Sequence, residues 1–260
     1  MPPVTSLHTT VLGDDGSPVI FCHGLFGQGK NWTQAAKTLA DRHRVTLVDM
    51  PNHGRSDWVD EVDYAQMAGA VADLIDEPVA LVGHSMGGKV AMLVALHHPE
   101  LVERLCVVDV SPVPYQHHDE FRGYMDAMLA LDLPADARRG DADEALTPAV
   151  PHPTVRAFLM QNLRRTGDGW RWMPNLEVLR RDLDALSDWP ETEASYDGPV
   201  LWIAGAESPY VKDEYAPTME ALFPRVRKVT IKGAGHWVHS QQPDVFAEVL
   251  RRFVDTPDRS

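Results

Sequence analysis

The sequence has 260 residues, of which 44% are hydrophobic and 24% are charged, the proportions of an ordinary globular domain. This composition excludes disordered, collagen-like and coiled-coil proteins, and no apolar run approaches the roughly 18 residues that a membrane span needs. The formal net charge of −14 argues against nucleic acid or a membrane surface as a partner, because both are negatively charged.

Short apolar runs predict strands that are buried on both faces, since they are rich in Val, Leu and Ile and do not alternate. In chain order they are Pro18–Cys22, Arg44–Asp49, Pro78–Val82, Arg104–Val110, Pro199–Ala204 and Lys228–Ile231. Helical spacing of apolar residues predicts helices at Trp32–Asp41, Tyr64–Ile75, Met86–His97 and Asp244–Phe253. Strands alternating with helices predict an α/β fold with a mostly parallel central sheet flanked by helices.

This alternation stops near Ser111. The following stretch contains helix-like segments, such as Phe121–Leu131 and Pro153–Leu163, and no convincing strand. We therefore expect a helical cap, residues 111–186, inserted after the strand that ends near Val110, and a core made of residues 1–110 and 187–260. An insertion at the carboxyl end of a strand is well placed to cover a ligand site.

The cysteines and the start of the chain bear on its compartment. Cys22 and Cys106 lie inside apolar runs, where we expect small buried residues and no disulfide framework. The segment Met1–His8 lacks a basic stretch followed by an apolar one, so we expect no secretory signal and a cytoplasmic protein. A monomer or a homodimer is expected.

The sequence Gly83-His-Ser85-Met-Gly87 matches G-x-S-x-G. A buried strand precedes it and an apolar helix follows, which is the context of a nucleophile elbow. The glycines make room for a sharply bent backbone at Ser85. The pattern predicts that Ser85 projects its hydroxyl from the end of the sheet, beside a helix N-terminus that favours anions.

Together with this elbow, three further segments resemble those of the α/β-hydrolase superfamily: His23–Gly27, Asp49–Ser56 and Gly233–Pro243. The details of the chain look most like the small YbfF-type bacterial esterases and the related mitochondrial abhydrolases. The resemblance covers nearly the whole chain. It implies a serine hydrolase that needs no cofactor and no metal.

A serine hydroxyl needs a base to remove its proton, and the base needs a carboxylate to orient it. Hydrolases of this fold place these groups in the order Ser, acid, His, and His236 follows the last strand in a glycine-rich loop. His239 is an alternative, although it lies where a helix begins. His23 and His53 are expected to hydrogen-bond within their own loops.

The acid is less clearly marked. Members of the family often carry an Asp where this chain has Ser208, in Gly205-Ala-Glu-Ser208. The resemblance to the small esterases implies Asp109 instead, which ends an apolar strand and would be costly to bury without a partner. Glu207, or the absence of a conventional acid, is the alternative.

Two backbone N–H groups should receive the oxyanion that forms when the carbonyl is attacked. We expect them from Met86, which follows the nucleophile, and from Leu25 in the loop after the first buried strand. The aromatic and Met-rich cap is expected to supply part of an acyl pocket.

We therefore expect a carboxylesterase-type serine hydrolase acting on small-molecule esters of short to medium acyl chains. Thioesters, lactones, perhydrolysis and acyl transfer to alcohols use the same triad, and the fold does not choose among them. A ligand-sensing protein without turnover is an alternative of another class, favoured only by the missing Asp at position 208.

Overall fold

The computed structural model describes residues 6–116, 119–134, 136–167 and 169–256. Its central sheet has seven strands in the order β1-β3-β2-β4-β5-β8-β9, and every neighbouring pair is parallel except β1 with β3. The strands are β1 (Thr9–Leu12), β2 (Ser17–Cys22), β3 (His43–Val48), β4 (Val79–His84), β5 (Val102–Val108), β8 (Val200–Gly205) and β9 (Val226–Ile231). The predicted mostly parallel sheet is confirmed, and β1 is an additional edge strand that the sequence pattern did not indicate.

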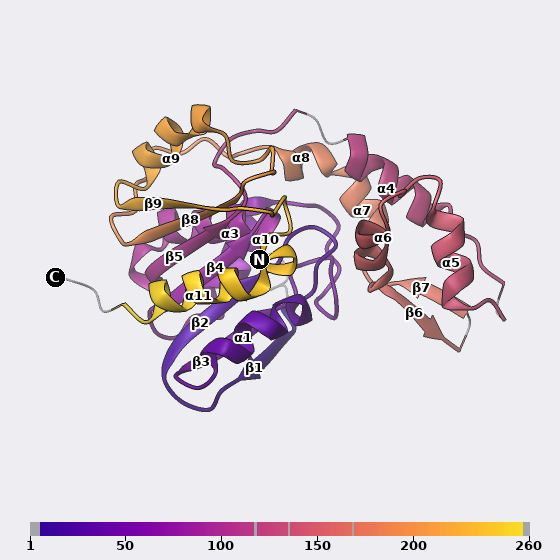
Figure 1. Cartoon of the computed structure of the whole chain (residues 1–260), viewed down its shortest axis with the longest axis horizontal. Helices are drawn as coiled ribbons and strands as arrows, with labels where there is room; N and C mark the ends of the chain where they lie inside the picture. The colour runs from indigo at the N-terminus through magenta and orange to yellow at the C-terminus, as the bar shows by residue number, and fades with distance from the viewer. Residues whose placement is uncertain (1–5, 117–118, 135, 168, 257–260) are drawn as a thin grey trace.

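Helices cover both faces of this sheet (Figure 1). On one face α2 (Tyr64–Ala72) and α3 (Met86–His97) pack against each other and share a hydrophobic core with the sheet. On the other face α1 (Thr33–Leu39) packs against α11 (Pro243–Val254) around a second core. Shorter helices complete the core: η1 (Gly29–Trp32), η2 (Pro99–Leu101), η3 (Asp213–Tyr215), α9 (Ala216–Leu222) and α10 (Val238–Gln241).

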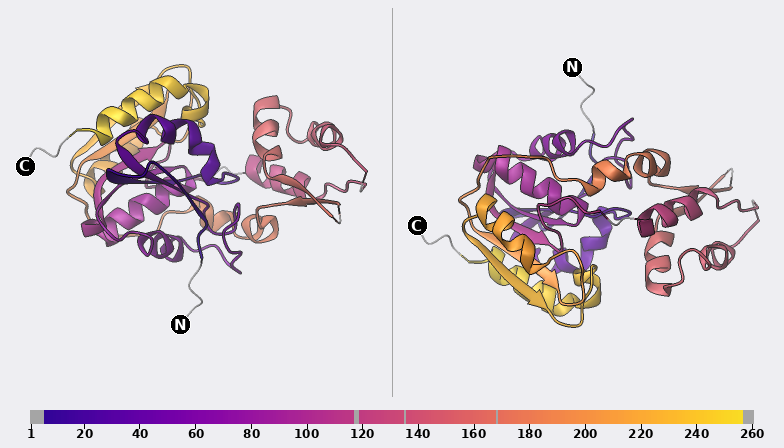
Figure 2. Two further views of the ribbon diagram at one scale, coloured as in Figure 1. Left: turned by 90° about the horizontal axis from the view of Figure 1, so that it is seen from below. Right: turned by 90° about the horizontal axis from the view of Figure 1, so that it is seen from above.

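A group of elements between β5 and β8 extends from the core to one end of the molecule (Figures 1 and 2). It comprises α4 (Asp119–Leu129), α5 (Arg139–Leu146), α6 (Pro153–Met160), β6 (Leu163–Thr166), β7 (Gly169–Trp172), α7 (Leu176–Arg181) and α8 (Leu183–Ser187). We propose that residues 111–186 form the cap, with α8 ending where the chain returns to the core.

The cap contains an antiparallel hairpin of β6 and β7, and the expectation of no strand in this stretch is therefore wrong. The hairpin reads Leu-Arg-Arg-Thr and Gly-Trp-Arg-Trp, so it lacks the apolar run on which strand prediction relied. Its tryptophans are hydrogen-bonded to other parts of the cap. Trp172 Nε1 donates to the carbonyl of Met128 in α4 at 2.8 Å, and Trp170 Nε1 donates to that of Ala137, just before α5, at 3.2 Å.

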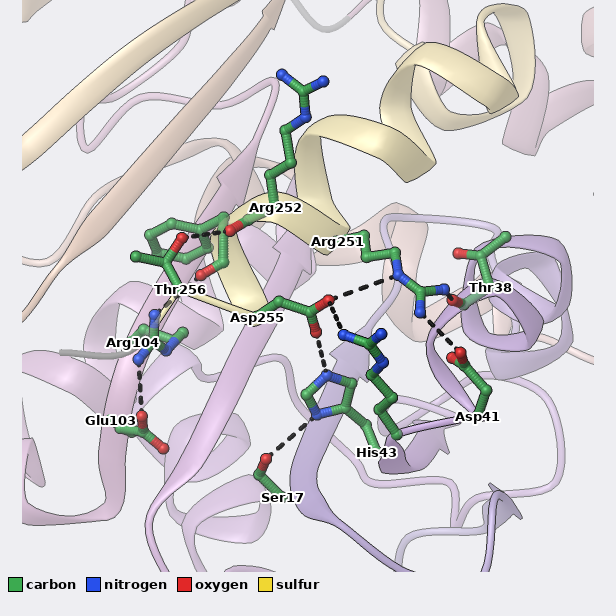
Figure 3. Close-up of polar contacts among 12 residues, drawn as sticks. Ser17, Thr38, Asp41, His43, Glu103, Arg104, Arg251, Arg252, Asp255 and Thr256 are labelled. Carbon is green, nitrogen blue, oxygen red and sulfur yellow. Dashed lines mark hydrogen bonds and ion pairs between the residues drawn. The ribbon is translucent and has the colours of Figure 1, made fainter.

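The last helix is fastened to the core by a polar cluster at the end of the molecule away from the cap (Figures 1 and 3). Asp255 accepts a hydrogen bond from His43 Nε2 at 2.8 Å and pairs with Arg251 at 3.5 Å. Arg251 in turn pairs with Asp41 at 2.7 Å. The buried guanidinium of Arg104 donates to the carbonyl of Phe253 at 2.9 Å. These contacts join α11 to β3, β5 and the end of α1.

Candidate active site

Ser85 stands between β4 and α3 in a backbone conformation that L-residues rarely adopt, with φ 52° and ψ −120°. The turn is tight because neighbouring backbone fills the space around its glycines. A Cβ on Gly83 would lie 2.2 Å from the carbonyl oxygen of Gly87, and one on Gly87 would lie 2.5 Å from that of Cys22. The sequence G-x-S-x-G is required here because any side chain at either glycine would collide with main chain.

Ser85, His236 and Asp109 lie in one hydrogen-bonded row. His236 Nε2 is 3.1 Å from Ser85 Oγ, and His236 Nδ1 is 2.8 Å from Asp109 Oδ2. With the Nδ1 proton donated to the carboxylate, Nε2 is free to accept the serine proton. Asp109 is fully buried, whereas Ser85 remains partly exposed. The arrangement has the geometry of a nucleophile, a base and an orienting acid.

Asp109 has two further partners. Its Oδ1 accepts the Gly205 N–H at 2.8 Å, and its Oδ2 also accepts the hydroxyl of Ser208. Ser208 occupies the position where the family often has an acid, and here it serves as a donor to the acid on the neighbouring strand. Glu207 is exposed, and no bond from its side chain to His236 is found among the described residues.

The loop after β2 lies directly against the elbow, since a Cβ on Gly24 would lie 3.0 Å from Ser85 Cβ. Across the described ranges, neither the Leu25 N–H nor the Met86 N–H is donated to another group of the protein. Two free N–H groups beside a serine hydroxyl are what an oxyanion hole requires.

Two buried histidines support this loop. His23 Nδ1 donates to the carbonyl of Gly24 at 2.8 Å, and its Nε2 accepts the Met50 N–H at 2.9 Å. His53 Nε2 accepts the Phe26 N–H at 3.2 Å, and its Nδ1 donates to the carbonyl of Pro51. Both rings are therefore neutral, in agreement with burial, which lowers the pKa of His23 to about 3 and that of His53 to about 4.

The remaining histidines near the site surround His236. His84 Nε2 donates to the backbone carbonyl of His236 at 2.8 Å. His239, the alternative base, packs on Trp32 with ring centroids 4.3 Å apart. Burial lowers its pKa to about 3, so it is neutral at pH 7. No contact joins it to Ser85 in the part of the chain that the structure describes.

A small cavity of about 50 Å³ opens beside Ser85 and Met86. Most of its wall is apolar and comes from both the core and the cap: Leu25, Val110, Phe121, Leu183 and Leu186. The aromatic side chains that the cap contributes to this wall are those of Tyr115 and Phe121. Tyr124, Met125, Met128 and Leu159 are buried in the hydrophobic cluster that the cap shares with the rest of the molecule.

The structure thus brings together all the predicted site residues: Ser85, His236 and Asp109 in one row, with Leu25 and Met86 on the wall beside Ser85. Sequence reasoning missed Ser208, whose only signal was its place in the segment where the family often has Asp. It also missed Lys89, which follows the elbow by one helical turn and lines the same cavity.

Comparisons with known proteins identify the family of the chain. The sequence profile of the alpha/beta hydrolase fold matches residues 17–243. The chain is 39% identical over 251 residues to sn-1-specific diacylglycerol lipase ABHD11 of Xenopus laevis, covering 93% of this chain and 80% of that one. It is 32% identical over 247 residues to Esterase YbfF of Escherichia coli (strain K12), covering 93% and 94%.

Among solved structures, one named as a marine microorganism esterase superimposes with a TM-score of 0.92 at 33% identity, covering 96% of this chain and 99% of that one. The chain therefore belongs to the α/β-hydrolase family. This confirms the resemblance drawn from the sequence motifs, including the likeness to small bacterial esterases and to ABHD11-type abhydrolases.

Proposed function

We propose that this protein is a cofactor-free serine esterase that hydrolyses small carboxylic esters through an acyl-enzyme intermediate. The observation that carries the proposal is the hydrogen-bonded triad Ser85–His236–Asp109. It lies beside two backbone N–H groups that donate no hydrogen bond within the described part of the protein. Relatives named as esterases and a lipase, similar over nearly the full chain, support it.

In the proposed reaction Ser85 Oγ attacks the ester carbonyl while its proton passes to His236 Nε2. The carbonyl oxygen becomes an oxyanion and accepts hydrogen bonds from the Leu25 and Met86 N–H groups. His236 then protonates the leaving alcohol, and Asp109 stabilises the imidazolium throughout. Water, deprotonated by His236, attacks the acyl group and releases the acid and Ser85.

The size of the cavity supports short acyl chains. The cavity beside Ser85 is small, about 50 Å³, and its wall is mostly apolar. We therefore propose that acetyl to butyryl esters react faster than long-chain ones, and a panel of acyl lengths measures this preference directly.

The test is turnover of p-nitrophenyl acetate and butyrate by the wild type and by Ser85→Ala, together with labelling by a fluorophosphonate. We expect Ser85-dependent turnover and labelling at Ser85. If the wild type shows neither, the enzyme proposal fails and the ligand-sensing alternative takes its place.

Location and assembly are also proposals. No helix in the described part of the chain has the length and apolarity to span a bilayer. The two cysteines are buried and unpaired, which is typical of a reducing compartment, so we propose a cytoplasmic protein. Cell fractionation and size-exclusion chromatography test the compartment and the proposed monomer or homodimer.

A further inference from the structure

A buried lysine lies on the wall of the cavity that contains the nucleophile. Lys89 is on α3, four residues after Ser85, and is only 2% exposed. Four residues are about one turn of a helix, so both side chains are on the same face. The wall of the cavity beside Ser85 is mostly apolar, and Lys89 is the one charged residue among the described residues that line it.

The ammonium group of Lys89 is only partly satisfied by the protein. It donates to the carbonyls of Ser187 at 2.9 Å and Asp188 at 2.6 Å, at the end of α8. The rings of Tyr115 and Tyr64 lie 4.9 and 5.7 Å from Nζ. Within the described ranges, no carboxylate forms an ion pair with it, and its third N–H has no acceptor.

A buried cation without an anionic partner is costly. The structure shows this cost, since burial lowers the pKa of Lys89 to about 7, with the nearby Asp188 acting in the opposite direction. An anion that entered the cavity would supply the missing charge and the missing acceptor. The strongest hydrogen bonds in proteins are those between such charged partners.

The part of the substrate that occupies this cavity follows from the position of the base. His236 must protonate the leaving alcohol, so the alcohol lies on the His236 side of Ser85. The cavity is lined by Ser85, Met86 and Lys89 but not by His236. The acyl part of the ester therefore extends into the cavity, with its far end toward Lys89.

We propose that Lys89 is a specificity-determining residue that makes this esterase prefer acyl chains ending in a carboxylate, that is, the half-esters of short dicarboxylic acids. This inference rests on the proposed esterase function. The reaction itself is unchanged: the ester bond breaks as for any acyl chain, and the distal carboxylate forms an ion pair with Lys89 without taking part in the chemistry.

Three sets of ethyl esters with the same shape and different chain ends test the proposal. The acidic set is monoethyl succinate, glutarate and adipate. The neutral set replaces the carboxylate by an isopropyl group, as in ethyl 5-methylhexanoate for the glutarate. Ethyl 5-oxohexanoate carries a neutral acceptor at the same position. Released ethanol is measured by gas chromatography, and Ser85→Ala provides the background.

For the wild type we expect kcat/KM of the best half-ester to exceed that of its isopropyl counterpart by about tenfold or more, with the ketone between them. In Lys89→Met we expect the half-ester to lose about 30-fold in kcat/KM while the isopropyl ester changes less than about threefold. Lys89→Gln retains a hydrogen-bond donor but no charge. We expect this variant to keep kcat/KM for the ketone ester near the wild-type value and to lower kcat/KM for the half-ester.

Equal rates for the acidic and neutral esters in the wild type, or a parallel loss of both in Lys89→Met, would overturn the inference and leave the esterase intact. Ser85-independent release of ethanol from every ester would instead overturn the esterase itself. If Lys89→Met does not fold, the wild-type series and Lys89→Gln still decide the outcome.

Discussion

At the scale of single residues, Asp109 is the group on which most of the site converges. It lies at the end of β5 with φ 51°, a left-handed conformation, and accepts hydrogen bonds from strand β8, from Ser208 and from His236. Its carboxylate is fully buried, so these donors supply the hydrogen bonds that its oxygens would otherwise take from water. The unfavourable backbone conformation at Asp109 is maintained because its hydrogen bonds fix the position of the residue.

Replacing Asp109 by Asn should lower kcat about a thousandfold or more, because the amide favours the wrong tautomer of His236. Steady-state kinetics on p-nitrophenyl butyrate measures the loss, and circular dichroism checks that the variant is folded. The matched control is Glu207→Gln, which should retain wild-type activity. A large loss in Glu207→Gln with an active Asp109→Asn would assign the acid to Glu207.

Replacing Ser208 by Ala removes one donor from the buried carboxylate of Asp109. We expect a fall in kcat of about tenfold, because a lost hydrogen bond to a charged group costs about 1.5–3 kcal/mol and only part of that cost reaches the transition state. Ser208→Thr, which keeps the hydroxyl, should recover activity. Equal activity of Ser208→Ala and the wild type would mean that the Ser208 hydroxyl does not support the acid.

Sequence patterns were sufficient for the residues that follow family motifs and insufficient for their partners. Ser85 and His236 are marked by glycines that the tight backbone requires at Gly83, Gly87 and Gly233. Ser208 and Lys89 carry no such mark, because a serine in a loop and a lysine in a helix are ordinary. Their roles depend on contacts across 99 and 98 positions of the chain.

At the scale of elements, the cap is joined to the oxyanion loop by a buried amide. Asn162, just before β6, donates from Nδ2 to the carbonyl of Phe26 at 2.7 Å and accepts from Gln28 Nε2. The loop that supplies the Leu25 N–H is therefore held from one side by His53 and from the other by the cap.

Asn162→Ala should remove the side-chain donor of the Phe26 carbonyl and leave Gln28 Nε2 with only its weaker bond to the carbonyl of Gln161, at 3.3 Å. We expect a loss of stability of about 1–3 kcal/mol, measured by urea unfolding. We also expect a lower kcat, with faster hydrogen exchange at residues 24–30. Gln161→Ala, which removes the exposed contact to Asn31 and leaves Asn162 in place, is the control. Unchanged exchange in Asn162→Ala would show that the cap does not order this loop.

The elements that sequence patterns missed are those with little buried apolar surface. β1 pairs only at the sheet edge and none of its residues is fully buried, so it lacks the continuous apolar run of β2 to β5. The β6–β7 hairpin is rich in arginine and half exposed. The central strands could be predicted because they are buried on both faces. β1 and the β6–β7 hairpin are not buried in this way, so their sequences lack the apolar run that marks a strand.

At the scale of the whole molecule, the buried neutral histidines make stability depend on pH. The pKa of His53 is about 4 in the folded protein, and in the unfolded chain it has its ordinary value near 6.5. Between these values the unfolded state binds the extra proton, so stability is complete above about pH 6.5 and falls as the pH decreases toward 4. The slope is roughly 1.4 kcal/mol per pH unit for one such group.

His53→Gln keeps an acceptor for the Phe26 N–H but does not titrate. The variant should be less stable than the wild type at pH 7.5, and the difference should shrink by roughly 2–3 kcal/mol at pH 4.5. Urea unfolding at several pH values measures both free energies. Parallel curves for the two proteins would show that His53 is not the titrating group.

The polar cluster around Asp255 (Figure 3) has a practical consequence for the use of this protein on solid supports. It anchors the end of α11 at the pole of the molecule that faces away from the cap (Figure 1). A bead or sensor surface coupled beyond residue 256 would therefore leave the cap side turned toward the solution. A spacer that begins after Asp255 would preserve its bonds to His43 and Arg251, whereas trimming the chain before it would remove the hydrogen bond between the end of the last helix and β3.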